Sequence, residues 1–219
     1  MRTRHLPRRA LLRAGAALLA LVATAAGIAQ DAPAPAAPTG TVYNIEMIIF
    51  RDTSTQGGAE YWGTPGLSAR NIAGDESATG TTQVGHFVAL LPPSSYQLGD
   101  LESRLRSSGA YVPVAHVAWS QTASSWGTRA GFPLQKLGVD VDGLTGTVFL
   151  EHGQFLHLGM TLSYAMAAPP PGLNAPPGTA FTINESRRVK YYDRNYFDNP
   201  AYGVIALVSP AQGARAPGR

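Results

Sequence analysis

The sequence predicts an α+β domain in which a mostly antiparallel sheet of about six strands carries one helix packed on a face. Three observations lead to this fold class. Several segments alternate apolar and polar residues with the two-residue period of a strand. One stretch alone has the clear 3.6-residue period of an amphipathic helix. The links late in the chain are short enough for hairpins, which join antiparallel strands.

Chain length and composition fit a single domain with a hydrophobic core. The chain has 219 residues, of which 44% are hydrophobic and 14% are charged, so disorder throughout is not expected. The folded domain is expected over residues 42–210. Residues 30–41 are rich in proline and alanine and predict a linker, and residues 211–219 predict a flexible tail.

The first 29 residues have the layout of a cleaved export signal. Arginines precede an apolar run over residues 14–28, and small residues stand just before Gln30, where cleavage is expected. The run is shorter than the roughly 20 residues that span a bilayer, although a retained anchor is the alternative. Arg8 and Arg9 also fit a twin-arginine signal. We therefore expect the mature chain to be exported, without a transmembrane span, and to reside in the periplasm if the cell is a Gram-negative bacterium.

The first half of the domain predicts two strands around a long loop. Val42–Phe50 alternates, which indicates a strand with one buried side. Residues 51–82 show no period and predict a loop. His86–Leu91 predicts a short strand that ends at two prolines.

The helix is predicted over Ser94–Ser108. Three leucines fall on one stripe of it, and Glu102 and Arg106 form an i,i+4 pair. Gly109 suits the position just after a helix, where a left-handed conformation is common. Val114–Gln121 then predicts a strand that is apolar on both faces.

The second half predicts a connecting segment, a hairpin and two further strands. Residues 126–143 predict connecting structure, and residues 168–178 predict a loop because they contain five prolines. The last strand is apolar on both sides, as a central strand would be. The hairpin strands are Leu144–Glu151 and Phe155–Tyr164, and the later strands are Ala180–Lys190, with one wholly polar face, and Tyr202–Val208.

Charge and cysteine content exclude several classes of protein. The formal net charge is +3, but five arginines lie in the export signal, and the other 12 basic residues face 14 acidic ones. A nucleic-acid binder carries clustered positive charge, so this class is not expected. The absence of cysteine excludes disulfides, a cysteine nucleophile and a thiolate metal site.

Catalytic and cofactor motifs are not found. The chain has neither a Gly-x-Ser-x-Gly elbow nor a phosphate-binding loop. Its histidines have no recognisable ligand spacing, and no spacing selects two carboxylates for a glycosidase. We predict no catalytic residue, no metal and no cofactor, with Glu151 and Glu185 as the candidates to test if the chain were a hydrolase.

A basic and aromatic stretch over residues 186–200 is the strongest candidate for ligand binding. Guanidinium groups bind carboxylates, and aromatic rings stack on sugars and cations. The alternative is that the tyrosines belong to the core and its rim while the arginines pair with Glu185, Asp193 and Asp198. The predicted binding residues are Arg187, Arg188, Tyr192, Tyr196 and Phe197, with Trp119 as aromatic support and His157 on the polar face of its strand.

Four blocks of sequence together resemble the CsiV-type peptidoglycan-binding proteins of Gram-negative bacteria. The blocks are Tyr43–Phe50, His116–Gln121, Leu144–Val148 followed by Phe155–Leu158, and Glu185–Arg188 followed by Tyr196–Val204. Two departures stand out: Gln154-Phe155 replaces an Arg-Tyr of the family, and the late block lacks two histidines that the family tends to carry. That joint loss argues against a metal or acid–base role there.

The resemblance implies a non-enzymatic periplasmic protein that binds peptidoglycan. It also implies that this protein supports cell-wall synthesis together with an outer-membrane lipoprotein activator of a bifunctional penicillin-binding protein. Two alternatives stay open. The chain could be an envelope scaffold that binds only proteins, through an exposed sheet edge, or an uncharacterised hydrolase of the wall glycan.

Overall fold

The computed structural model describes residues 40–53 and 84–211, all within a compact unit that spans Ala37–Arg219. Four expectations therefore lie wholly or largely outside the described residues. They are the export signal over 1–29, the linker over 30–41, the loop over 51–82 and the tail over 211–219. No described helix is long and apolar enough to cross a membrane.

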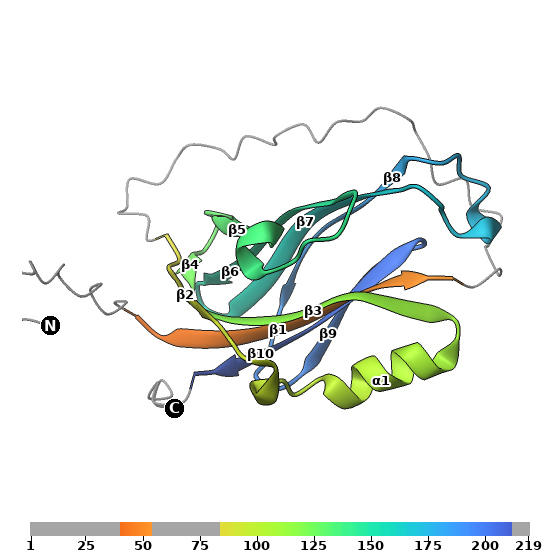
Figure 1. The fold of residues 1–219 in the computed structure, drawn as a ribbon. Helices are drawn as coiled ribbons and strands as arrows, with labels where there is room; N and C mark the ends of the chain where they lie inside the picture. Colours follow the sequence, from red (N-terminus) through yellow and green to blue (C-terminus); the bar gives the residue numbers. More distant parts are fainter. Residues whose placement is uncertain (1–39, 54–83, 212–219) are drawn as a thin grey trace, which may run out of the picture. The chain divides into compact units, whose positions relative to one another are not determined.

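Ten strands form two five-stranded sheets in the described part of the chain (Figure 1). Every pairing is antiparallel except that of β4 with β6. Sheet A has the order β2 (Phe87–Leu90), β3 (Tyr111–Thr122), β1 (Val42–Asp52), β10 (Tyr202–Pro210) and β9 (Arg194–Asn199). Sheet B has the order β4 (Ser124–Ser125), β6 (Leu144–His152), β7 (Leu156–Met166) and β8 (Thr179–Arg188), and β5 (Gly131–Pro133) also pairs with β6.

The main core lies between the two sheets. Inward side chains of β1 and β10 share one buried cluster with those of β6, β7 and β8. The Tyr202 hydroxyl of sheet A donates a hydrogen bond to the Leu162 carbonyl of sheet B over 3.3 Å. The α+β prediction of a mostly antiparallel structure is thus confirmed, but the prediction of one sheet of about six strands is wrong. Alternation shows that a strand has two unlike faces, yet it does not show which sheet the strand joins.

The helix α1 (Gly99–Ser108) covers the outer face of sheet A (Figure 1). Leu98 and Leu105 pack there with Ile48, Phe50 and Leu207 in a second buried cluster. β1 is therefore buried on both faces, and the prediction of one buried side is wrong. The physical reason is that the helix shields the face that carries polar as well as apolar residues.

The helix begins five residues later than predicted. A 3₁₀ turn over Pro93–Ser95 precedes it and ends at Tyr96, whose ψ of 138° is extended and not helical. Its end is as predicted, since Gly109 has a φ of 70°. The predicted pair of Glu102 and Arg106 is also formed, at 2.5 Å.

The late hairpin and the polar strand are confirmed as β6, β7 and β8. The segment 126–143 holds more structure than expected, because β5 and a 3₁₀ turn over Leu134–Leu137 lie in it and both of those leucines are fully buried. The edge strand β9 was not predicted, since the stretch was interpreted only as a binding segment.

Candidate ligand-binding surface

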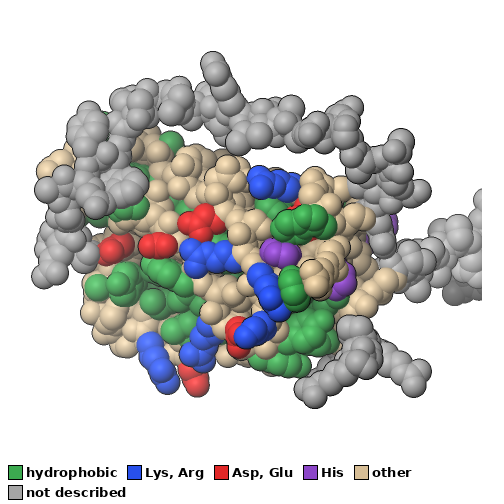
Figure 2. All heavy atoms as spheres, turned by 180° about the vertical axis from the view of Figure 1, so that it is seen from behind, with side chains coloured by type: hydrophobic (Ala, Val, Ile, Leu, Met, Phe, Trp, Pro, Cys, Tyr) green, Lys and Arg blue, Asp and Glu red, His purple; other side chains and the backbone are tan. Residues whose placement is uncertain are grey.

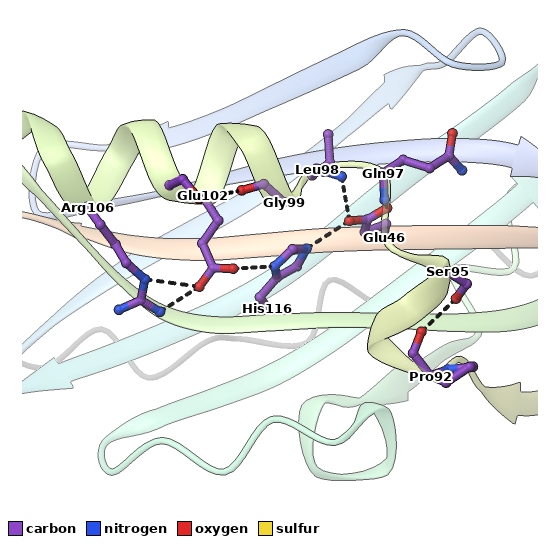
Figure 3. A network of polar contacts seen from close by, with 10 residues as sticks. Glu46, Pro92, Ser95, Gln97, Leu98, Gly99, Glu102, Arg106 and His116 are labelled. Carbon is purple, nitrogen blue, oxygen red and sulfur yellow. Dashed lines mark hydrogen bonds and ion pairs between the residues drawn. The ribbon is translucent and has the colours of Figure 1, made fainter.

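A network of polar contacts lies beneath helix α1 (Figure 3). Glu46 of β1 is only 4% exposed, and its carboxylate accepts hydrogen bonds from the backbone N–H groups of Gln97 and Leu98, at 2.7 and 2.8 Å. These groups lie at the start of a helix that has no side-chain cap of its own. Glu46 thus caps the helix from the neighbouring sheet, where a negative charge also suits the helix dipole.

His116 of β3 joins this carboxylate to the helix surface. Its Nε2 lies 2.8 Å from Glu46 Oε1 and its Nδ1 lies 2.8 Å from Glu102 Oε2, while the Tyr96 ring is 4.5 Å away. Burial opposes the charged form, but the hydrogen bonds to the two glutamates raise the pKa of His116. The contacts of His116 with Glu46 and Glu102 therefore stabilise the packing of helix α1 on sheet A.

Two of the predicted binding residues, Trp119 and Phe197, are fully buried. Trp119 belongs to the core between the sheets, and its Nε1 donates a hydrogen bond to Gln121 Oε1 over 2.7 Å. Neither ring presents a free face on which a sugar could stack.

The predicted binding residues Tyr192 and Tyr196 are both exposed, but Tyr196 lies in strand β9 and Tyr192 in the link before it. Tyr196 is 46% exposed and stacks on Phe50, at 6.2 Å between ring centroids, on the helix side of sheet A. Partial burial raises the pKa of Tyr196 to about 12, so it stays neutral. Tyr192 is 61% exposed in the link before β9, with a φ of 65°.

The consecutive arginines point to opposite faces of sheet B, as strand geometry requires. Arg187 is the cross-strand neighbour of the core residue Leu158. It pairs with Glu185 at 2.7 Å and its guanidinium lies over the Phe197 ring. Arg188 lies on the outer face instead. The two arginines therefore do not form one binding pair.

Arg188 belongs to an exposed cluster at one end of the outer face of sheet B. Its guanidinium carbon lies 3.4 Å from the centroid of the Phe155 ring, and its cross-strand neighbour is His157. His157 in turn contacts the Trp126 ring, at 4.1 Å between centroids. Trp126 and Phe155 are 58% and 38% exposed. We call these four residues the Trp126–Arg188 cluster.

The hairpin turn makes room for this arrangement. Gly153 lies against Trp126, and a Cβ on it would come within 3.0 Å of the Cβ of Trp126. Figure 2 shows, on the face seen from behind, histidine, Lys or Arg and hydrophobic side chains next to one another. Among the described residues no carboxylate pairs with Arg188. The cluster can thus offer a cation and two rings to a ligand.

Sequence reasoning placed Arg188 and His157 in the site but missed Trp126 and Phe155. Trp126 lies at the start of the segment that the sequence predicts as connecting structure, and nothing in the serine before it or the glycine after it indicates that its ring is exposed. Phe155 stood at the position where the chain departs from the family's hairpin motif. The contact of Trp126 with His157 follows the parallel pairing of β4 with β6, and that of Phe155 with Arg188 follows the pairing of β7 with β8; no local pattern indicates either pairing.

The glutamates within the described residues are all engaged. Glu46 and Glu102 bind His116, Glu185 binds Arg187, and Glu151 accepts a hydrogen bond from the backbone N–H of Arg129 while being 2% exposed. In the same part of the chain, no group of three or more His, Asp or Glu side chains is placed to hold a metal ion.

Comparison with known proteins gives one family. The model of the family described as "Peptidoglycan-binding protein, CsiV" matches residues 16–211, which is most of the chain. No curated protein and no solved structure matches. The match includes every described strand up to β10 and the helix, so it covers both the polar group under α1 and the Trp126–Arg188 cluster.

Proposed function

Since the chain belongs to the CsiV family of peptidoglycan-binding proteins, we propose that it is a non-enzymatic periplasmic protein that holds peptidoglycan during cell-wall synthesis. In this proposal it acts with an outer-membrane lipoprotein that activates a bifunctional penicillin-binding synthase. The observation that carries the binding part is the Trp126–Arg188 cluster, a cation and two exposed rings on one sheet face.

The chemistry of the ligand fits the cluster. Peptidoglycan joins amino-sugar rings to short peptides that end in carboxylates. The Arg188 guanidinium can bind a carboxylate in a bidentate way, and Trp126 and Phe155 can stack on sugar rings. Of the residues predicted from sequence, Arg188 and His157 are retained as contacts with the wall, and Tyr192 and Tyr196 remain exposed candidates outside the cluster.

The test is co-sedimentation of residues 30–219 with insoluble peptidoglycan sacculi. We expect the unaltered protein to pellet with sacculi and a folded control of equal size to stay in solution. Arg188→Ala should weaken binding about tenfold, because a hydrogen bond to a charged group contributes roughly 1.5–3 kcal/mol. It should also make binding less sensitive to salt.

Arg187→Ala is the matched control. It removes the same side chain one residue earlier, on the opposite face, where the guanidinium is already paired with Glu185. We expect it to leave sacculus binding within about twofold of the unaltered protein. Equal losses in the two variants, or none in either, would contradict binding through the cluster.

The partner and the absence of catalysis are tested separately. Crosslinking in cells should trap a lipoprotein or a synthase. If it does so while sacculi fail to pellet the protein, the chain is a protein-binding scaffold. Release of muropeptides from sacculi, lost in Glu151→Gln or Glu185→Gln, would identify a hydrolase instead.

A further inference from the structure

The exposed polar row on β8 has no role in the core. Sheet residues alternate between faces, so Thr182, Asn184, Ser186 and Arg188 share the outer face of this strand, and all four are exposed. Their neighbours Ile183 and Phe181 are buried in the core. In the described residues β8 pairs with β7 alone, which places the row at the rim of sheet B.

Hydroxyl and amide groups continue across the neighbouring strands. Thr182 is opposite Ser163 of β7, which is opposite Thr145 of β6. Asn184 is opposite Thr161, whose hydroxyl lies 3.3 Å from Asn184 Oδ1, and Thr161 is opposite Thr147. These side chains donate and accept hydrogen bonds. An apolar partner on this face would leave them unsatisfied at a cost in free energy, whereas a polyhydroxylated ligand would satisfy them.

The row runs directly into the Trp126–Arg188 cluster, since Arg188 is its last member. From Thr182 to Arg188 it spans six residues, or roughly 20 Å at the rise of a strand. This length accommodates more than one sugar ring. The side chains also change in kind along the row, from uncharged hydrogen-bonding groups to a cation beside two rings.

We propose that the outer face of β8 is a track for the glycan strand of peptidoglycan, with the peptide carboxylate held at its Arg188 end. This inference rests on the proposed function and adds which chemical part of the wall is bound where. The glycan hydroxyls pair with Thr182, Asn184 and Ser186. The carboxylate pairs with the Arg188 guanidinium, for which it supplies a counter-charge that the described residues do not.

The experiment compares four forms of the protein purified from the periplasmic fraction: the unaltered protein, Arg188→Ala, a row variant and a matched control. Each form is tested on two probes. The first probe is intact sacculi. The second is glycan strands from which an amidase has removed the peptides, with the lactyl carboxylates that this hydrolysis exposes then converted to amides. The row variant carries Thr182→Val, Asn184→Ala and Ser186→Ala. The matched control carries Ser103→Ala and Ser107→Ala, which remove two hydroxyls from the exposed surface of α1. Circular dichroism and the Tm verify that each form is folded.

We expect the row variant to bind stripped glycan at least tenfold more weakly than the unaltered protein, because it lacks three hydrogen-bonding side chains. The control should bind as the unaltered protein does. Arg188→Ala should keep its affinity for stripped glycan and lose the additional affinity for intact sacculi.

Two results would overturn the inference while leaving the proposed function in place. One is a folded row variant that binds stripped glycan as tightly as the unaltered protein. The other is an unaltered protein that binds intact sacculi but not stripped glycan. If intact sacculi do not retain the unaltered protein, the proposed function fails and the glycan track fails with it.

Discussion

Two histidines of this protein, each beside an aromatic ring, occupy opposite kinds of site. His116 lies between two carboxylates under helix α1, with the Tyr96 ring 4.5 Å away. His157 lies on the outer face of sheet B, with the Trp126 ring 4.1 Å away and Arg188 as its cross-strand neighbour. The first site has its charges neutralised within the protein, and the second pairs a histidine with an arginine.

The difference follows from what covers each sheet. Helix α1 shields the outer face of sheet A, so a charge there must find partners or become neutral. In the described part of the chain no helix covers the outer face of sheet B, and no carboxylate there pairs with Arg188. A histidine beside an aromatic ring is therefore not by itself a binding signal. The partners of its ring nitrogens distinguish the two sites.

The largest expected effect is on the covered site. Glu46→Gln should lower the free energy of unfolding by about 3 kcal/mol. It removes the buried negative charge that His116 contacts, and it leaves one backbone N–H at the start of the helix without an acceptor. Urea denaturation measures this loss. Asp100→Asn, an exposed carboxylate in the first turn of the same helix, is the control and should cost only a few tenths of a kcal/mol. Equal effects in the two variants would show that Glu46 does not cap the helix.

The next effect is the pH dependence of stability. Hydrogen bonds to Glu46 and Glu102 raise the pKa of His116 above 6.5, although burial acts in the opposite direction. Its stabilising contribution is therefore fully present below pH 6.5 and is lost as the pH rises through the folded-state pKa. Arg106 and His116 lower the pKa of Glu102 below 4.5 against the effect of burial, so the contribution of Glu102 is lost as the pH falls through its own folded-state pKa.

These signs predict maximal stability from this group between about pH 4.5 and 6.5. The Tm of the unaltered protein should fall by a few degrees when the pH is raised well above that window. His116→Gln should flatten this alkaline decline. A variant that keeps the full decline would assign the pH dependence to other groups.

The fold could be predicted from sequence where a local pattern determines it. The hairpin of β6 and β7 follows from apolar residues at every second position of the later strand and from the His152-Gly153 turn, and the end of α1 follows from Gly109. The division into two sheets could not be predicted, because alternation does not name a strand's neighbours. The burial of Glu46 could not be predicted either. A polar residue on one face of a strand indicates that this face is exposed to solvent, and the helix that covers Glu46 lies far from it in the sequence.

The candidate surface was predicted only in part. The alternation of the 180–190 segment already places Arg187 and Arg188 on opposite faces, as the structure confirms. Trp119 and Phe197 were chosen for their aromatic rings, but composition does not distinguish a core ring from an exposed one. Trp126 contacts His157 through strand pairing across 31 residues of chain, which no spacing rule reveals.

The smallest expected effect on stability is that of the same histidine-to-glutamine change made at His157 instead of His116. His157→Gln should change the free energy of unfolding by no more than about 0.5 kcal/mol, as is usual for surface sites, because its side chain makes no ion pair in the described residues. It should nevertheless weaken sacculus binding, since the Trp126 ring loses the imidazole that it rests against. The ratio of the two effects distinguishes the sites: His116→Gln should reduce stability and spare binding by the folded protein, whereas His157→Gln should do the reverse. If both variants lost stability equally, the surface cluster would be part of the structural framework.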